Sequence, residues 1–142
     1  MLKNSIVFLL SSMLLFSGVS CQSEPEAYSE NAATLSVTKW LKLMDSENYR
    51  ESWETASDTF KTQVAVDAWI KTALAARSPL GEVVSRKLIS QTYETSLQGT
   101  PDGEYVVMEF RTEFTNRQTT NETITPMLDL DGKWRVSGYY IR

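Results

Sequence analysis

The chain has 142 residues, with 18 acidic and 14 basic side chains, one cysteine and no histidine. A net charge of −4 without a basic stripe argues against binding to nucleic acid, because that affinity rests on neutralising phosphates. The lack of histidine excludes a Ser-His-Asp triad, a Cys-His pair and the common zinc sites. We therefore expect neither a metal nor a cofactor.

The N-terminus has the three parts of a secretory signal peptide. Lys3 supplies a positive charge, residues 6–16 form an uncharged and mostly aliphatic run, and small residues follow at 17–20. The run is shorter than the about twenty apolar residues that span a bilayer. We predict that residues 1–20 are a signal peptide and that the chain is exported. A retained transmembrane anchor is the alternative.

Residues 18–21, Gly-Val-Ser-Cys, resemble the bacterial lipobox, in which the cysteine sulfur takes a diacylglyceryl group. Gly18 stands where leucine is usual, so ordinary cleavage that leaves a free Cys21 is the alternative. We predict a lipidated Cys21, because two or more acyl chains hold a protein stably at a membrane. Gln22 follows instead of aspartate. In a Gram-negative envelope, the resemblance then implies an anchor in the outer membrane, facing the periplasm.

Residues 22–31 contain Glu24, Pro25 and Glu30 and have little apolar content, which predicts a solvated tether after Cys21. Residues 32–142 then form a single domain, since about 110 residues bury one core but not two. The single cysteine permits no internal disulfide. Packing must therefore stabilise this domain.

Helical patterns open the domain. Apolar residues recur at helical spacing over residues 33–44. Asn48 and Glu51 resemble a capping box, and they predict a short helix with Tyr49 and Trp53 on one face.

A third helical pattern covers residues 59–76, and we expect a break near Ala65. The residues expected to face inward are Phe60, Val64, Ala68 and Trp69. Residues 78–81, Ser-Pro-Leu-Gly, are typical of a turn and end the helical part.

Thr, Val, Tyr and Phe dominate after residue 82, and turn sequences divide the remainder into strands. We predict four strands, at residues 83–97, 105–116, 120–130 and 134–141. Thr-Pro-Asp-Gly at 100–103 and Asp-Gly at 131–132 predict the hairpin turns. Helices followed by hairpins predict an α+β fold, with N-terminal helices on one face of a curved four-stranded antiparallel meander. Strands of about 12 residues must twist around the helices, as in cystatin-like and nuclear-transport-factor-like cones.

Alternation along the strands predicts their faces. The second strand places Val106, Met108, Phe110 and Phe114 on one side and Tyr105, Glu109, Arg111 and Glu113 on the other. Pro126 cannot donate to a ladder, so we expect a bulge in the third strand. On the fourth strand we expect Tyr140 to share a face with Trp134 and Val136.

The first strand leaves two alternatives for Arg86. The sets of apolar residues that compete for its inward face are Val84 with Leu88, and Val83 with Ile89 and Tyr93. In the first alternative Arg86 points inward and needs a buried carboxylate, for which Glu122 is placed on the third strand. In the second alternative Arg86 is solvated. The inward alternative makes Arg86 and Glu122 candidate binding residues.

Four tryptophans, at 40, 53, 69 and 134, are a heavy aromatic content for one small domain. Such residues usually form the core. An aromatic-lined cleft is the alternative, and it adds Trp53, Trp134 and Tyr140 to the candidate binding residues.

Several blocks of the sequence resemble an uncharacterised bacterial family known as domain of unknown function 4019. The blocks are Ser52-Trp53, Ala56-Ser57, Phe60, Trp69, Arg77-Ser78-Pro79-Leu80-Gly81, Ser85-Arg86, Gly99-Thr100-Pro101-Asp102-Gly103-Glu104-Tyr105 and the ending Asp-Gly-Lys-Trp-Arg-Val-Ser-Gly-Tyr-Tyr-Ile at 131–141. They cover nearly all of the predicted domain. The resemblance implies an exported setting and no particular activity.

Two hypotheses for the function follow. The favoured one is a binding or interaction module of the cell envelope, tethered to the membrane by its lipid, that holds an envelope protein or a small ligand. The other is a small acid-base enzyme of the isomerase type, with Tyr93, Glu122 or Tyr140 as the acting groups. The enzyme would require an acidic residue with a raised pKa inside a pocket.

Overall fold

The structure, a computed structural model, describes residues 26–142. The helices are α1 (Glu26–Asp45), α2 (Tyr49–Glu54), α3 (Asp58–Gln63) and α4 (Val66–Arg77), followed by the 3-10 turn η1 (Ser78–Leu80). The strands are β1 (Val83–Glu94), β2 (Tyr105–Phe114), β3 (Arg117–Leu128) and β4 (Trp134–Ile141). No helix in the described range is long and apolar enough to cross a bilayer. The predicted signal peptide and Cys21 lie outside the described residues.

The helix α1 begins at Glu26, so it overlaps the stretch predicted as a tether. The side chain of Gln91 on β1 donates a hydrogen bond of 3.0 Å to the carboxylate of Glu30. Ala33, one turn further along, is fully buried. The polar composition before residue 32 thus belongs to a helix that already contacts the sheet.

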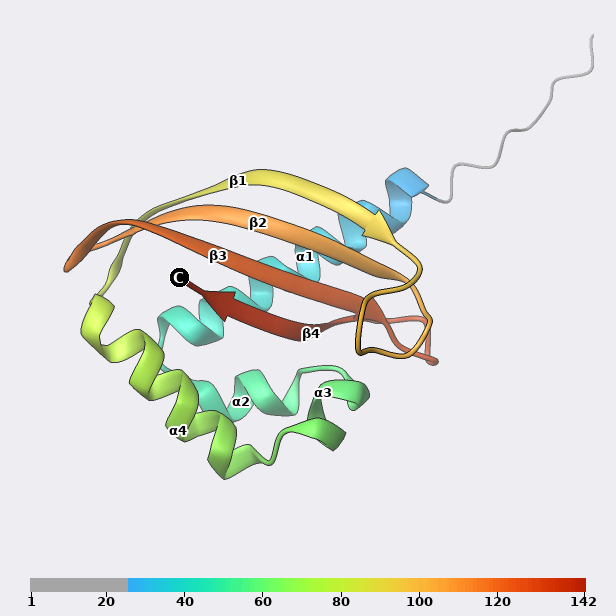
Figure 1. Ribbon diagram of the computed structural model, residues 1–142, viewed down its shortest axis with the longest axis horizontal. Helices are drawn as coiled ribbons and strands as arrows, with labels where there is room; N and C mark the ends of the chain where they lie inside the picture. Colours follow the sequence, from blue (N-terminus) through green and yellow to red (C-terminus); the bar gives the residue numbers. More distant parts are fainter. Residues whose placement is uncertain (1–25) are drawn as a thin grey trace, which may run out of the picture.

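The four strands form one antiparallel sheet in the order β1-β2-β3-β4. Each pair of neighbours is therefore a hairpin, which confirms the predicted meander and the α+β class. Figure 1 shows the curved sheet with α1 running behind it and with α2, α3 and α4 beyond the edge strand β4.

One hydrophobic core joins the helices to one face of the sheet, called here the inner face. Its buried members are Ala33, Val37, Trp40, Leu41, Met44, Tyr49, Ala56, Phe60, Trp69, Ala73, Val106, Met108, Ile124 and Val136. The predicted faces of β2 are confirmed, since Val106 and Met108 are fully buried while Glu109 and Arg111 are exposed. On α4 the prediction for Ala68 is wrong, because this residue is exposed beside the buried Trp69.

Ser52, which is fully buried, binds both core tryptophans. The indole of Trp40 donates to the carbonyl oxygen of Ser52 at 2.8 Å, and the indole of Trp69 donates to its hydroxyl oxygen at 2.9 Å. That hydroxyl donates in turn to the carbonyl oxygen of Tyr49 at 2.8 Å. Each buried donor has a partner, so two large rings enter the core without an unpaired N–H group.

The short helices begin near the predicted residues. The chain is extended at Ala65, between α3 and α4, which confirms the break. Ser57 caps α3 by accepting a hydrogen bond of 3.1 Å from the N–H group of Phe60. Asn48 precedes α2 as predicted, but its amide binds the Glu51 carboxylate and leaves the helix backbone uncapped. The hydrogen bonds of the predicted capping box are therefore wrong.

The strand β1 combines parts of both predicted alternatives. Its register shifts between Val83 and Ser85 and again between Leu88 and Ser90. Val83, Arg86 and Tyr93 pair with residues on the inner face of β2, namely Phe114, Thr112 and Val106. These three side chains therefore share the inner face although their spacing is irregular, because each bulge inserts a residue that reverses the alternation. Val84 and Ile89 are 62% and 49% exposed.

A further register shift lies between Thr125 and Pro126, which confirms an irregularity at Pro126. The extra residue is Ser137 of β4, so the bulge lies opposite Pro126 and not in the third strand as expected. Across this shift Tyr139 pairs with the buried Ile124, so Tyr139 faces inward. Tyr140 is 72% exposed on the outer face. The prediction that Tyr140 shares a face with Val136 is wrong, because it continued a strict alternation through a bulged pair of strands.

Candidate functional site

Two arginines and two carboxylates meet at the inner face of the sheet. Arg86 comes from β1 and Glu122 from β3, while Asp45 and Arg77 are the last residues of α1 and α4. The Glu122 side chain is fully buried, and the Arg77 and Arg86 side chains are 5% and 13% exposed. Five elements of the chain are required to assemble these groups and Tyr139 of β4.

Arg86 is held by both carboxylates. Its Nε donates to Oε1 of Glu122 at 3.0 Å. Its two terminal nitrogens donate to the two oxygens of Asp45 at 2.7 and 2.9 Å, a bidentate pair. Asp45 also accepts a hydrogen bond of 2.7 Å from Arg77. The predicted pairing of Arg86 with Glu122 is present, and Asp45 completes it.

Tyr139 closes the network on its other side. Its hydroxyl donates to Oε2 of Glu122 at 2.9 Å and accepts from Arg77 at 3.2 Å. The guanidinium of Arg77 also lies 4.9 Å from the centre of the Phe114 ring, a cation–π distance. With two positive and two negative members, the network is neutral as a whole.

The network sets the protonation of its members. Burial alone would raise the pKa of Asp45, but hydrogen bonds from Arg86 and Arg77 outweigh burial and hold this pKa below its usual value. Burial, together with the charge of Glu122, raises the pKa of the Tyr139 phenol. Asp45 is therefore an ionised carboxylate and Tyr139 a neutral phenol at neutral pH. Asp45 thus lacks the raised pKa that an acid-base enzyme would need.

The other groups proposed for acid-base chemistry do not meet. Tyr140 lies on the outer face, opposite the buried Glu122. Tyr93 pairs with Val106, further along the sheet than Arg86 and its partner Thr112. The three nitrogens of Arg86 are all engaged by carboxylates. The network therefore fits a structural role, in which it joins helices to strands, better than it fits an open reaction site.

Sequence reasoning missed three members of the network: Asp45, Arg77 and Tyr139. Asp45 and Arg77 end their helices, where a charged residue carries no special signal. Tyr139 was missed because the bulge of β4 turns it inward, whereas strict alternation placed Tyr140 there. The available clue was the hydrogen-bonding capacity of a buried carboxylate. A single arginine leaves some of the carboxylate lone pairs without a donor, so further donors are expected nearby.

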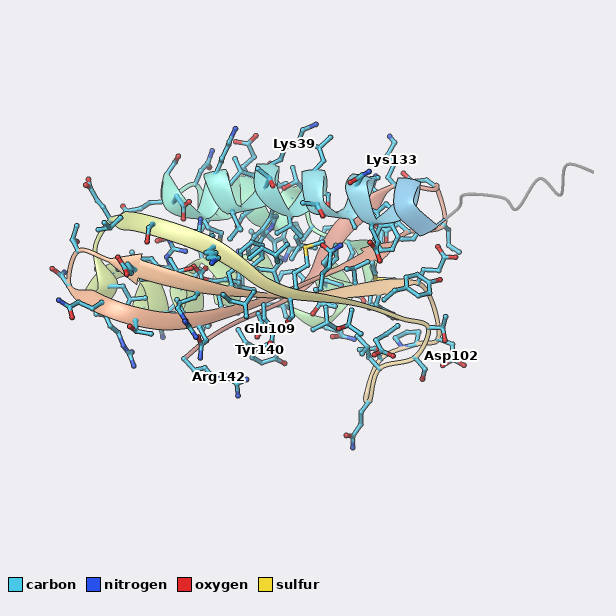
Figure 2. All side chains as sticks on the ribbon, turned by 90° about the horizontal axis from the view of Figure 1, so that it is seen from above. Lys39, Asp102, Glu109, Lys133, Tyr140 and Arg142 are labelled. Atoms are coloured by element: carbon cyan, nitrogen blue, oxygen red, sulfur yellow. The ribbon has the colours of Figure 1, made fainter. Side chains whose placement is uncertain are left out.

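A groove with a volume of about 350 Å³ lies between α1 and β4. Its lining residues are Ser36, Lys39, Trp40, Leu43, Glu51, Thr55, Lys133, Trp134, Arg135 and Val136. An adjoining hollow of about 360 Å³ shares Ser36, Lys39, Lys133 and Trp134 and adds Ala32, Leu35 and Gly132. Figure 2 shows Lys39 and Lys133 projecting on the same side of the molecule.

The structure separates the three remaining candidate binding residues. Trp134 is half-buried and lines the groove. Trp53 packs against the core, and its indole donates to the carbonyl oxygen of Val64 at 2.7 Å. Tyr140 lies over a hollow of about 320 Å³ on the outer face, on the opposite side from Lys39 and Lys133 (Figure 2). Trp134 is thus the candidate that joins a groove of mixed apolar and charged lining.

The described residues contain no group of three or more Cys, Asp or Glu side chains placed to hold a metal ion.

Comparison with curated proteins gave no match. Comparison with protein families matched residues 36–139 to the family described as "Protein of unknown function (DUF4019)". The match includes all four members of the ionic network, Tyr139 and the lysines of the groove. The chain therefore belongs to this family.

Proposed function

We propose that the chain is an exported, lipid-anchored binding module of the cell envelope, and that its ligand lies in the groove between α1 and β4. The observation that carries the proposal is this groove of about 350 Å³, which contains the half-buried Trp134. Ligand sites are usually concave and mainly apolar, with a few polar groups that orient the ligand. The groove has that composition, while the ionic network has its donors engaged within the protein.

We further propose that the domain is a cone of the cystatin-like or nuclear-transport-factor-like type. Support comes from strands of 10 to 12 residues in β1, β2 and β3 and from three hairpins whose register shifts. Bulges increase twist and bend a sheet around its contents. The inner face is filled by the core and the ionic network, which supports a ligand site beside the proposed cone and not inside it.

The export and the anchor rest on residues 1–21 of the sequence. We propose that Cys21 carries the lipid and holds the domain at the outer membrane, facing the periplasm. Mass spectrometry of the mature protein from a Gram-negative host should find an N-terminal Cys21 with attached acyl chains. Cys21→Ser should shift the protein from the detergent phase to the soluble periplasmic fraction. A wild-type protein that is membrane-bound and retains residues 1–20 would instead establish the transmembrane alternative.

Ligand binding is tested by native mass spectrometry of the mature protein purified from its host. We expect a bound small molecule, and we expect Trp134→Ala to lose it. Tyr140→Ala is the matched control, because it removes an exposed aromatic ring from the outer face. If both variants retain the ligand equally, the ligand does not bind in the groove. A ligand-free wild type that captures an envelope protein would favour the interaction surface over the small ligand.

A further inference from the structure

The groove contains two lysines without a direct carboxylate partner among the described residues, although the charges of Lys133 and Asp131 attract each other. None of the ion pairs between described residues includes Lys39 or Lys133. Both lysines line the groove and also its adjoining hollow, so they stand where the two meet. This positive site occurs in a chain whose net charge is −4.

The other charged groups of the groove are already engaged. Arg135 donates to Asp129 and Asp131 at 2.8 and 2.7 Å. The carboxylate of Glu51 accepts from the amide of Asn48. An amide is neutral, so Glu51 keeps its negative charge, but it lines the groove and not the adjoining hollow. The charged residues that line the hollow, and that it shares with the groove, are the two lysines. Like charges that share a concave surface repel each other, and an anion placed between them relieves the repulsion.

Apolar surface extends on both sides of the lysines. The groove contains Leu43, Val136 and Trp134, and the adjoining hollow contains Leu35, which is 54% exposed. A free carboxylate or phosphate would leave this surface in contact with water. A ligand with an apolar chain would cover it, and the indole of Trp134 offers a large flat contact.

We propose that the groove binds a free amphiphile with an anionic head, such as a carboxylate or a phosphate, and a single apolar chain. This assignment rests on the proposed function and names the chemical class of its ligand. The head lies between Lys39 and Lys133, and the chain lies along Trp134. The charge complementarity of the two lysines selects an anionic head, and the apolar lining selects the chain.

The test is isothermal titration calorimetry of the mature protein with dodecanoate below its micelle concentration. The head-group controls are 1-dodecanol and dodecyltrimethylammonium, which carry the same chain without the negative charge. We expect dodecanoate to bind, dodecanol to bind at least tenfold more weakly, and the cationic compound to give no heat. The double variant Lys39→Glu, Lys133→Glu should lose about tenfold or more of the dodecanoate affinity, since each exposed charge contributes modestly.

Lys71→Glu, Lys87→Glu is the matched control, because it makes the same change in net charge at two exposed lysines outside the groove. It should bind dodecanoate like the wild type. Equal affinities for dodecanoate and dodecanol, unchanged in the groove variant, would overturn the anionic class while leaving a ligand-binding groove intact. Binding to phosphatidylglycerol vesicles without binding to dodecanoate would assign the lysines to a membrane surface and also overturn the proposal.

Discussion

Arg86 and Glu122 bind each other across an intervening strand. The hydrogen bond of 3.0 Å joins β1 to β3, although β2 lies between them in the sheet. The residue of β2 that pairs with Arg86 is Thr112, which has a short side chain on the same face of the sheet. The contact therefore links strands that share no backbone hydrogen bonds, and it does so on the face that meets the helices.

Replacing Glu122 by Gln should strongly destabilise the fold. The change leaves two guanidinium groups near the inner face with one carboxylate, and breaking a buried ion pair costs about 3–5 kcal/mol. Urea denaturation of the mature protein measures the free energy of unfolding. Glu113→Gln, an exposed carboxylate on the outer side of β2, is the control. Similar small effects in both variants would refute a stabilising role for the network.

The linkage of Asp45 to protons should appear in acid. Its folded pKa lies below the ordinary value of 3.8, so its contribution to stability is present above about pH 3.8 and is lost as pH falls toward the folded pKa. A protonated Asp45 has nearly the shape of asparagine. The difference in unfolding free energy between wild type and Asp45→Asn should therefore shrink when urea titrations are carried below pH 3.8. A difference that stays constant with pH would contradict the linkage.

Gly81 should tolerate alanine worse than Gly132 does. Both have positive φ, 79° and 76°, which costs an alanine about 1–3 kcal/mol, and at Gly81 the ψ of −157° lies in a region that is essentially restricted to glycine. At Gly81 an added Cβ would also lie 2.0 Å from the hydroxyl oxygen of Thr115, which accepts a hydrogen bond from the N–H group of Glu82. At Gly132 nothing lies within 4 Å. Thermal denaturation of Gly81→Ala and Gly132→Ala compares the stability of the two variants. Equal losses of stability would show that the turn before β1 shifts to accommodate the added methyl group.

Thr112 should accept valine without loss of stability. Its hydroxyl and that of Thr120 are buried and have no hydrogen-bond partner within the part of the chain that the structure describes. Replacing an unpaired buried hydroxyl by a methyl group of similar shape is neutral or stabilising. Ser52→Ala is the contrasting variant, because it removes a hydroxyl that serves Trp69 and Tyr49, and it should cost about 1–3 kcal/mol. A clear loss in Thr112→Val, measured with urea, would point to a hydrogen bond at this hydroxyl.

The parts of the fold that follow from local rules could be predicted from the sequence. The alternation of β2 and the register shift at Pro126 each have a visible residue signal. The two bulges of β1 lie among Val, Ser, Leu and Ile, without a proline or glycine to mark them. Strict alternation therefore gave two opposed alternatives, whereas the strand satisfies a part of each.

Only the pair of Arg86 and Glu122 could be predicted from the sequence, and not the rest of the site. Burial of Arg86 required a carboxylate, which led to Glu122 by face matching on the strands. Asp45 and Arg77 come from helix ends whose positions over the sheet depend on the packing of α1 and α4. No spacing in the sequence encodes that arrangement, since it results from tertiary contacts of the core.

The bulge opposite Pro126 also bears on how β4 tolerates errors of pairing. A slip of one residue along a strand exchanges its two faces, and such slips are the usual fault in hairpin assembly. Here a slip in one of the two directions would replace the half-buried Tyr139 by its neighbour, Tyr140. A strand that slipped in this direction would still present a phenol toward Glu122, so the doubled tyrosine provides redundancy at the position of β4 that binds this carboxylate.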